Sequence, residues 1–184
     1  MSALLRVRLL IVVVALLGVG GVTAAVASGG GGQRRFSTDL IGYEEVPAVS
    51  SPGGGSFKAV ISRSADEIRY ELSYSALQGN VTQSHIHFGQ EAVAGGISVF
   101  LCSNLGNGPA GTQPCPPSGT VTGTIRPVDV IGPAAQGIAA GEFAELVKAL
   151  RAGVAYANVH STMWPGGEIR GQLGDSDHDH GHDD

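Results

Sequence analysis

Apolar and polar residues alternate with a period of two along several short stretches of the chain. In residues 67–74, EIRYELSY, the four apolar or aromatic residues share one face, and the charged and polar residues share the other. Residues 57–63, FKAVISR, alternate in the same way. This period is typical of a half-buried β-strand. The sequence SADE at 64–67, between the two stretches, predicts a hairpin turn.

Six further stretches read as strands and are separated by turns rich in Gly, Pro, Asn and Ser: 35–42, 81–88, 96–101, 120–127, 155–161 and 167–173. About eight short strands predict an all-β fold, a Greek-key β-sandwich or barrel. One segment differs, because GEFAELVKALRAG at 141–153 spaces its apolar residues as a helix does. We expect one short helix over about 141–152, lying against one end of the sandwich.

The N-terminal residues resemble an export signal rather than part of a fold. Arg6 and Arg8 precede the apolar run 9–22, and Ala25-Val26-Ala27 fits the small-x-small pattern for cleavage after Ala27. An uncleaved membrane anchor is the alternative. The expected organisation is a signal peptide at 1–27, a flexible linker at 28–34, a domain at 35–174 and a disordered tail at 175–184. The chain is therefore expected to be extracytoplasmic: secreted, periplasmic or at the cell surface.

Composition and charge exclude some partners. Without residues 1–27 the chain keeps 9 basic and 16 acidic residues, a net charge of −7, and five of the acids lie in the tail. No basic patch interleaved with aromatic residues is present, so nucleic acid is not expected as a partner. The tail histidines His178, His180 and His182 alternate with aspartates, a pattern that binds divalent metals weakly.

The two cysteines, Cys102 and Cys115, enclose a loop of turn residues. In an exported protein an even cysteine count predicts a structural disulfide. A redox-active or metal-binding pair would call for a close spacing such as CxxC, which the chain lacks.

Alternation also predicts which polar side chains lie together. His85 and His87, in SHIHFG, share one face of a strand. Two later strands each carry a polar face, and if all three strands are neighbours these faces converge: Tyr156, Asn158 and His160 on one, Glu168, Arg170 and Gln172 on the other.

Two interpretations of this cluster stay open. His85, His87 and His160 are a ligand set suited to copper or zinc with an open position. Alternatively, the same residues form a structural hydrogen-bond network under a loop, with Glu168 and Arg170 as an ion pair. Catalysis has less support, because the chain has neither G-x-S-x-G nor H-E-x-x-H. Ser84 and Ser161 each neighbour a histidine, but adjacent residues on a strand face opposite ways.

Three motifs resemble the CHRD domain family, which is named after chordin and also occurs in exported bacterial proteins. They are LIGYEEVPAVSSPGGG, SHIHFG and AYANVHSTMWPGGEIRGQL, and the resemblance spans about Phe36 to Leu173. It implies an extracytoplasmic β-sandwich, commonly behind a signal peptide, with no established catalytic activity.

HIHFG is also similar to the histidine-x-histidine strand of copper/zinc superoxide dismutases. By that analogy His85, His87 and His160 would hold copper, but the loop after Gly89 has no histidine for a second metal. We therefore expect a non-enzymatic binding or structural module with an unidentified extracytoplasmic ligand or partner. The alternative is a mononuclear copper protein with a three-histidine site like that of superoxide dismutase.

Overall fold

The computed structural model describes residues 33–175, and their strands form a single antiparallel sheet. The strands are β1 (Arg34–Ile41), β2 (Gly54–Ile61), β3 (Ile68–Ser75), β4 (Val81–Phe88), β5 (Gly96–Ser103), β6 (Gly119–Ile125), β7 (Ala155–Ser161), β8 (Ile169–Gln172) and β9 (Gly174–Asp175). Their order across the sheet is β5-β4-β7-β8-β1-β2-β3-β6, with β9 paired to β1. The all-β prediction is confirmed, and each predicted strand has a counterpart.

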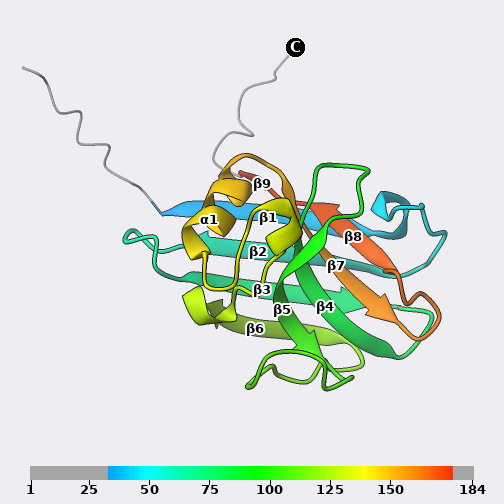
Figure 1. Cartoon of the computed structure of the whole chain (residues 1–184). Helices are drawn as coiled ribbons and strands as arrows, with labels where there is room; N and C mark the ends of the chain where they lie inside the picture. Colours follow the sequence, from blue (N-terminus) through cyan, green and yellow to red (C-terminus); the bar gives the residue numbers. More distant parts are fainter. Residues whose placement is uncertain (1–32, 176–184) are drawn as a thin grey trace, which may run out of the picture. The chain divides into compact units, whose positions relative to one another are not determined.

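The sheet curls into a nearly closed barrel, so its end strands β5 and β6 approach one another (Figure 1). Side chains bridge the gap between them. Tyr70 on β3 donates its hydroxyl hydrogen to the Leu101 carbonyl of β5 at 2.9 Å. Gln113, in the loop after β5, donates from Nε2 to the Thr122 carbonyl of β6 at 3.0 Å. We call this junction the seam.

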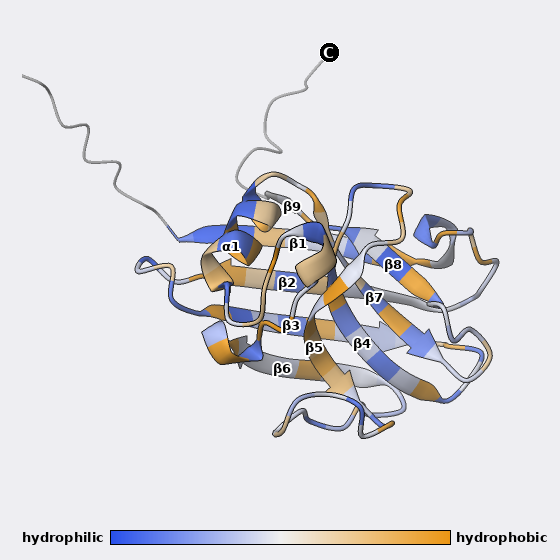
Figure 2. Ribbon diagram, in the orientation of Figure 1, coloured by the Kyte–Doolittle hydropathy of each residue, from blue (hydrophilic) through white to orange (hydrophobic). Residues whose placement is uncertain are grey.

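Alternating apolar residues of the strands fill the inside of the barrel. Figure 2 shows hydrophobic and hydrophilic segments alternating along β7 and β8. The largest fully buried side chains are aromatic or aliphatic: Phe36, Leu40, Phe57, Ile61, Ile68, Leu72, Ile86, Leu101, Ile125, Leu146, Leu150 and Ile169. Their burial supplies the main driving force for folding.

One α-helix is present among the described residues, α1 (Phe143–Arg151), beside three short 3-10 turns: η1 (Gly42–Glu44), η2 (Pro127–Asp129) and η3 (Ala134–Gln136). The predicted helix is confirmed to within two residues. Its apolar face joins the core, and Gly153 follows in the left-handed region with φ of 67°. Glycine adopts that conformation without steric cost, which explains where the helix ends.

Cys102 and Cys115 form the predicted disulfide, with Cα atoms 5.0 Å apart. The bond ties the loop that carries Gln113 back to β5. The predicted signal peptide and tail histidines lie outside the described residues, so these assignments stay predictions. The same holds for most of the predicted linker, whereas Arg34 already begins β1.

Candidate metal centre

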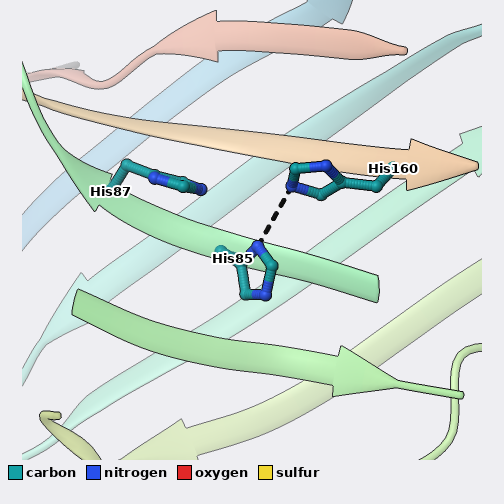
Figure 3. A group of neighbouring side chains, drawn as sticks. All are labelled: His85, His87 and His160. Atoms are coloured by element: carbon teal, nitrogen blue, oxygen red, sulfur yellow. Dashed lines mark hydrogen bonds between the residues drawn. The ribbon is translucent and has the colours of Figure 1, made fainter. Parts of the chain in front are cut away.

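Two neighbouring strands carry the three histidines on one face of the sheet. β4 pairs with β7 so that His87 lies opposite Tyr156 and His85 lies opposite Asn158. His160 lies two residues beyond Asn158 on β7, and therefore projects to the same face. Figure 3 shows the His87 and His160 rings pointing toward each other and the His85 ring facing them with one nitrogen. The structure brings His85, His87 and His160 together, as the sequence predicts.

This face of the sheet is buried, although its residues are polar. His85 is 0 % exposed, His87 7 % and His160 6 %. The ring of Phe100 on β5 meets the His85 ring edge-on, with centroids 4.4 Å apart. Residues 89–95, which we call the covering loop, contact His87 through the Gly95 carbonyl. The histidines therefore do not lie on a solvated sheet surface.

Backbone carbonyls fix the protonation pattern of two rings. His87 Nδ1 lies 2.9 Å from the Gly95 carbonyl oxygen, and His160 Nδ1 lies 2.8 Å from the Pro165 carbonyl oxygen. A carbonyl only accepts hydrogen bonds, so both Nδ1 atoms must carry the hydrogen. In each neutral ring the Nε2 atom is then left with a lone pair. Metal-binding histidines are typically oriented by such a bond from the second ring nitrogen.

The third ring completes the network. His85 Nδ1 lies 3.1 Å from His160 Nε2, and it donates the hydrogen, because His160 Nε2 has none to give. Three nearby polar atoms are buried without a hydrogen-bond partner: His87 Nε2, Asn158 Oδ1 and His85 Nε2, the last of which lies on the far edge of its ring from His160 (Figure 3). Each of them is an electron-pair donor. Buried polar atoms are rarely left unpaired, so this group indicates a site for a cation.

Burial keeps the three imidazoles uncharged. It lowers the pKa of His85 to about 2, with further lowering by His160 and His87. Burial also lowers the pKa of His87 to about 4; the contacts with the Gly95 carbonyl and the Asn158 side chain oppose this shift, and repulsion from Arg170 and from any proton on His160 reinforces it. The pKa of His160 is lowered by burial as well. Neutral imidazole is the form that binds a metal, so His87 and His160 offer their Nε2 lone pairs at neutral pH. His85 faces them with Nδ1, so its hydrogen must move from Nδ1 to Nε2 before it can bind the same ion.

The spacing of the nitrogens fits a single ion after a small movement. One ligand atom from each histidine lies within 4.8 Å of the other two. Three ligands arranged around one ion at about 2.0 to 2.1 Å are about 3.5 to 3.6 Å apart. A pair at the 4.8 Å limit must therefore close by about 1.2 Å. Rotations of the rings about their side-chain bonds can supply that movement, so the residues fit copper or zinc once the His85 hydrogen has moved to Nε2.

Most of the predicted polar cluster surrounds the histidines. The Tyr156 ring stacks on the His87 ring, with centroids 4.7 Å apart and planes 4° from parallel. The guanidinium carbon of Arg170 lies 3.4 Å from the centre of the Tyr156 ring. Gln172 donates to the Gly89 carbonyl at 3.0 Å and so holds one end of the covering loop.

Glu168 lies apart from this cluster. β8 begins only at Ile169, so alternation along the strand does not extend to Glu168. Its Oε1 accepts hydrogen bonds at 2.6 Å from both the Ser51 hydroxyl and the Gln78 backbone amide. Arg170 instead donates to the carbonyls of Val93 and Gln90. The Glu168–Arg170 ion pair expected in the network interpretation is absent from the described residues.

Sequence reasoning missed the residues that cover the site. Glu45, which follows η1, is only 7 % exposed, and burial raises its pKa to about 7 against the opposing charge of Arg170. Phe100 and the covering loop were also not predicted as parts of the site. They lie on a different strand or in irregular backbone, where alternation gives no signal.

The structure gives the serines beside the histidines no catalytic arrangement. Ser84 donates its hydroxyl hydrogen to the Asn158 carbonyl at 2.6 Å. The Ser161 oxygen accepts from the Trp164 backbone amide at 3.2 Å. Neither hydroxyl bonds to a histidine ring in the described part of the chain, in line with the opposite faces expected from the sequence.

A nearly closed antiparallel barrel with a disulfide and a buried polar cluster defines a β-domain suited to an oxidising compartment. The CHRD domain model matches residues 36–173, and the chain belongs to the CHRD domain family. CHRD domains are extracellular modules. No curated protein and no solved structure matches the chain significantly. Within residues 33–175, no helix is long and apolar enough to span a membrane.

Proposed function

We propose that this chain is an exported, non-enzymatic CHRD module that binds one copper ion through His85, His87 and His160. The observation that carries the proposal is the fixed, neutral state of the triad. Two rings donate from Nδ1 to backbone carbonyls, and the buried Nε2 atom of His87 has no hydrogen-bond partner. A purely structural network would be expected to satisfy that nitrogen.

Binding accounts for this arrangement better than catalysis does. A redox enzyme must let its substrate reach the metal, whereas here the covering loop, Phe100 and the Pro165 carbonyl surround rings that are at most 7 % exposed. The site thus resembles a superoxide dismutase in its ligands only. Export is supported by the family, by the disulfide and by the signal-like N-terminus.

Metal analysis of the exported chain tests the proposal, provided that the tail cannot contribute. We define the tail-substituted chain as the full chain with His178→Gln, His180→Gln and His182→Gln. Its only histidines are then the three of the site. After copper loading and desalting, we expect one copper per chain by mass spectrometry of the metal content.

His87→Gln in this background removes one ligand and should abolish stoichiometric copper. Gln83→Ala, on the same strand and without a ligand role, is the matched control and should keep it. Circular dichroism establishes that each variant is folded. A folded tail-substituted chain that retains no copper would show that the histidines form a structural network only.

A further inference from the structure

A fixed positive charge lies one aromatic ring away from the triad. Arg170 is on β8 and is only 2 % exposed. β7 lies between β8 and β4, and its Tyr156 contacts both neighbours. The guanidinium lies over the Tyr156 ring, and the Tyr156 ring is stacked on the His87 ring. Any ion held by His87 is therefore exposed to the field of Arg170.

Hydrogen bonds hold this charge in place, and no ion pair with another described residue neutralises it. Arg170 donates to the carbonyls of Val93 at 3.1 Å and Gln90 at 3.0 Å, and more weakly to the Gln172 side chain at 3.4 Å. All three acceptors are uncharged. No carboxylate among residues 33–175 lies within ion-pair distance of the guanidinium. Glu45 lies in its field, and because burial raises the pKa of that carboxyl to about 7, its charge compensates Arg170 only in part near neutral pH.

The ligands themselves supply no negative charge. The group that can hold an ion consists of three histidines, with no aspartate, glutamate or cysteine. Both cysteines of the chain are in the disulfide. A bound ion would therefore keep its full charge inside a buried site. The cost of burying an ion grows with the square of its charge, so a divalent ion pays about four times as much as a monovalent one.

The number of available ligands also favours a monovalent ion over Zn²⁺ and Cu²⁺. Zn²⁺ completes a tetrahedron with a fourth ligand, and Cu²⁺ takes tetragonal sites. Among the described residues, three imidazoles are the nitrogen ligands of this site, Asn158 Oδ1 is a neutral oxygen beside them, and Phe100 and the covering loop close around them. Monovalent copper has a low charge and accepts three ligands.

We propose that Arg170 makes the three-histidine site selective for Cu⁺ over divalent ions. This inference rests on the proposed function, because it requires that the triad bind a metal. Arg170 acts through the Tyr156–His87 stack and is not itself a ligand. Its repulsion acts twice as strongly on a divalent ion as on a monovalent one.

The test compares metal affinities in the tail-substituted chain at pH 7.5. Cu⁺ affinity is measured anaerobically by competition with bathocuproine disulfonate, and Zn²⁺ affinity by competition with nitrilotriacetate. We expect the parent chain to bind Cu⁺ more tightly than Zn²⁺. Arg170→Gln should shift the ratio of the two dissociation constants toward Zn²⁺ by on the order of tenfold, whereas Arg170→Lys should preserve the ratio.

Arg151→Gln is the matched control, because it removes an exposed positive charge on α1 and should leave the ratio unchanged. A second variant covers the case in which Arg170→Gln fails to fold. Glu45→Gln, measured at pH 8, removes the carboxyl that opposes Arg170 and should shift the ratio further toward Cu⁺.

The two proposals fail in different ways. A folded chain that binds neither ion refutes the proposed function. A chain that binds metal but favours Zn²⁺, or keeps its ratio in both Arg170→Gln and Glu45→Gln, refutes the role of Arg170 alone. An equal shift in the Gln and Lys variants also refutes it, because the lost hydrogen bonds rather than the charge would then set the preference.

Discussion

The three histidine rings are held by different partners, and this decides which nitrogen of each can bind a metal. His87 and His160 donate to backbone carbonyls, whereas His85 donates to His160. Both carbonyls belong to irregular backbone, at Gly95 and Pro165. The orientation of the ligands therefore depends on segments that the HxH spacing does not describe.

Nitrogen NMR of the metal-free, tail-substituted chain should show this pattern directly. Three imidazoles are expected, and all three should be neutral with the hydrogen on Nδ1 at pH 7, because each Nδ1 faces an acceptor. Adding Cu⁺ should shift the Nε2 resonances of His87 and His160 and the Nδ1 resonance of His85, whose hydrogen moves to Nε2 when Nδ1 binds the ion. Rings that exchange rapidly between tautomers, or that carry a positive charge, would contradict the hydrogen-bond network.

The lowered pKa values make folding sensitive to acid. The pKa of His85 falls from 6.5 to about 2 on folding, and that of His87 to about 4. Below pH 6.5 the unfolded chain takes up protons that the folded chain excludes. The contribution of these histidines is thus full above pH 6.5, and it declines as the pH falls toward 4, by on the order of 1.4 kcal/mol per pH unit for each histidine.

Glu45 opposes this trend in part. Its folded pKa of about 7 lies above the ordinary carboxyl value of 4.5, so between these pH values the folded chain holds a proton that the unfolded chain releases. Since three histidines outweigh one carboxyl, urea unfolding of the metal-free chain should give a free energy lower by several kcal/mol at pH 5.0 than at pH 7.5. His87→Gln should show a smaller pH dependence. Equal stability at both pH values would rule out buried neutral histidines.

At the scale of elements, the strands and α1 could be predicted from the sequence, but the cover of the site could not. Period-two alternation marks β4, β7 and β8, and it correctly grouped His85, His87 and His160. The same rule misplaced Glu168, because β8 starts at Ile169, two residues later than the predicted strand. The covering loop has no periodicity to read. It is held by side chains of other strands that bond to its backbone.

Tyr156 joins the covering loop to the sheet, and its hydroxyl can be removed without disturbing its ring. The hydroxyl oxygen accepts from the Gly95 amide at 3.1 Å. Tyr156→Phe keeps the stack on His87 and loses this bond, which should cost about 1 kcal/mol. We expect faster hydrogen exchange at residues 89–95, measured by mass spectrometry, and unchanged exchange in β2. Unchanged exchange in the loop would mean that Arg170 and Gln172 hold it without Tyr156.

At the scale of the whole molecule, alternation predicts that a barrel forms but not how its ends meet. Tyr70 was correctly placed on the core face of its strand, yet no pattern indicated that its hydroxyl reaches β5. Gln113 lies in a loop of turn residues, and nothing in the sequence there predicts that its side chain bridges two strands. Its partners, Thr122 and Leu101, come from the opposite end strands of the sheet. Such contacts depend on the closed barrel itself.

The disulfide supports the seam, because it holds the loop of Gln113 against β5. Replacing both Cys102 and Cys115 with Ser removes a cross-link across a sequence separation of 13. The loop-entropy estimate for such a cross-link is about 3 kcal/mol of stability. Urea unfolding should show a loss of that order, and reduction of the parent chain should reproduce it. A loss well under 1 kcal/mol would mean that the loop is held equally well without the bond.

Substitution of Gln113 tests how the barrel is closed, because its side-chain amide bridges the two end strands. Its amide nitrogen donates to Tyr70 Oη, the Leu101 carbonyl and the Thr122 carbonyl. Gln113→Ala removes these bonds and should cost about 1 to 2 kcal/mol. Gln113→Glu is isosteric, but its carboxylate at pH 7 places a negative charge against two carbonyl oxygens. The Glu variant should therefore be less stable than the Ala variant in urea unfolding. The reverse order would mean that the side chain fills space at the seam without bridging it.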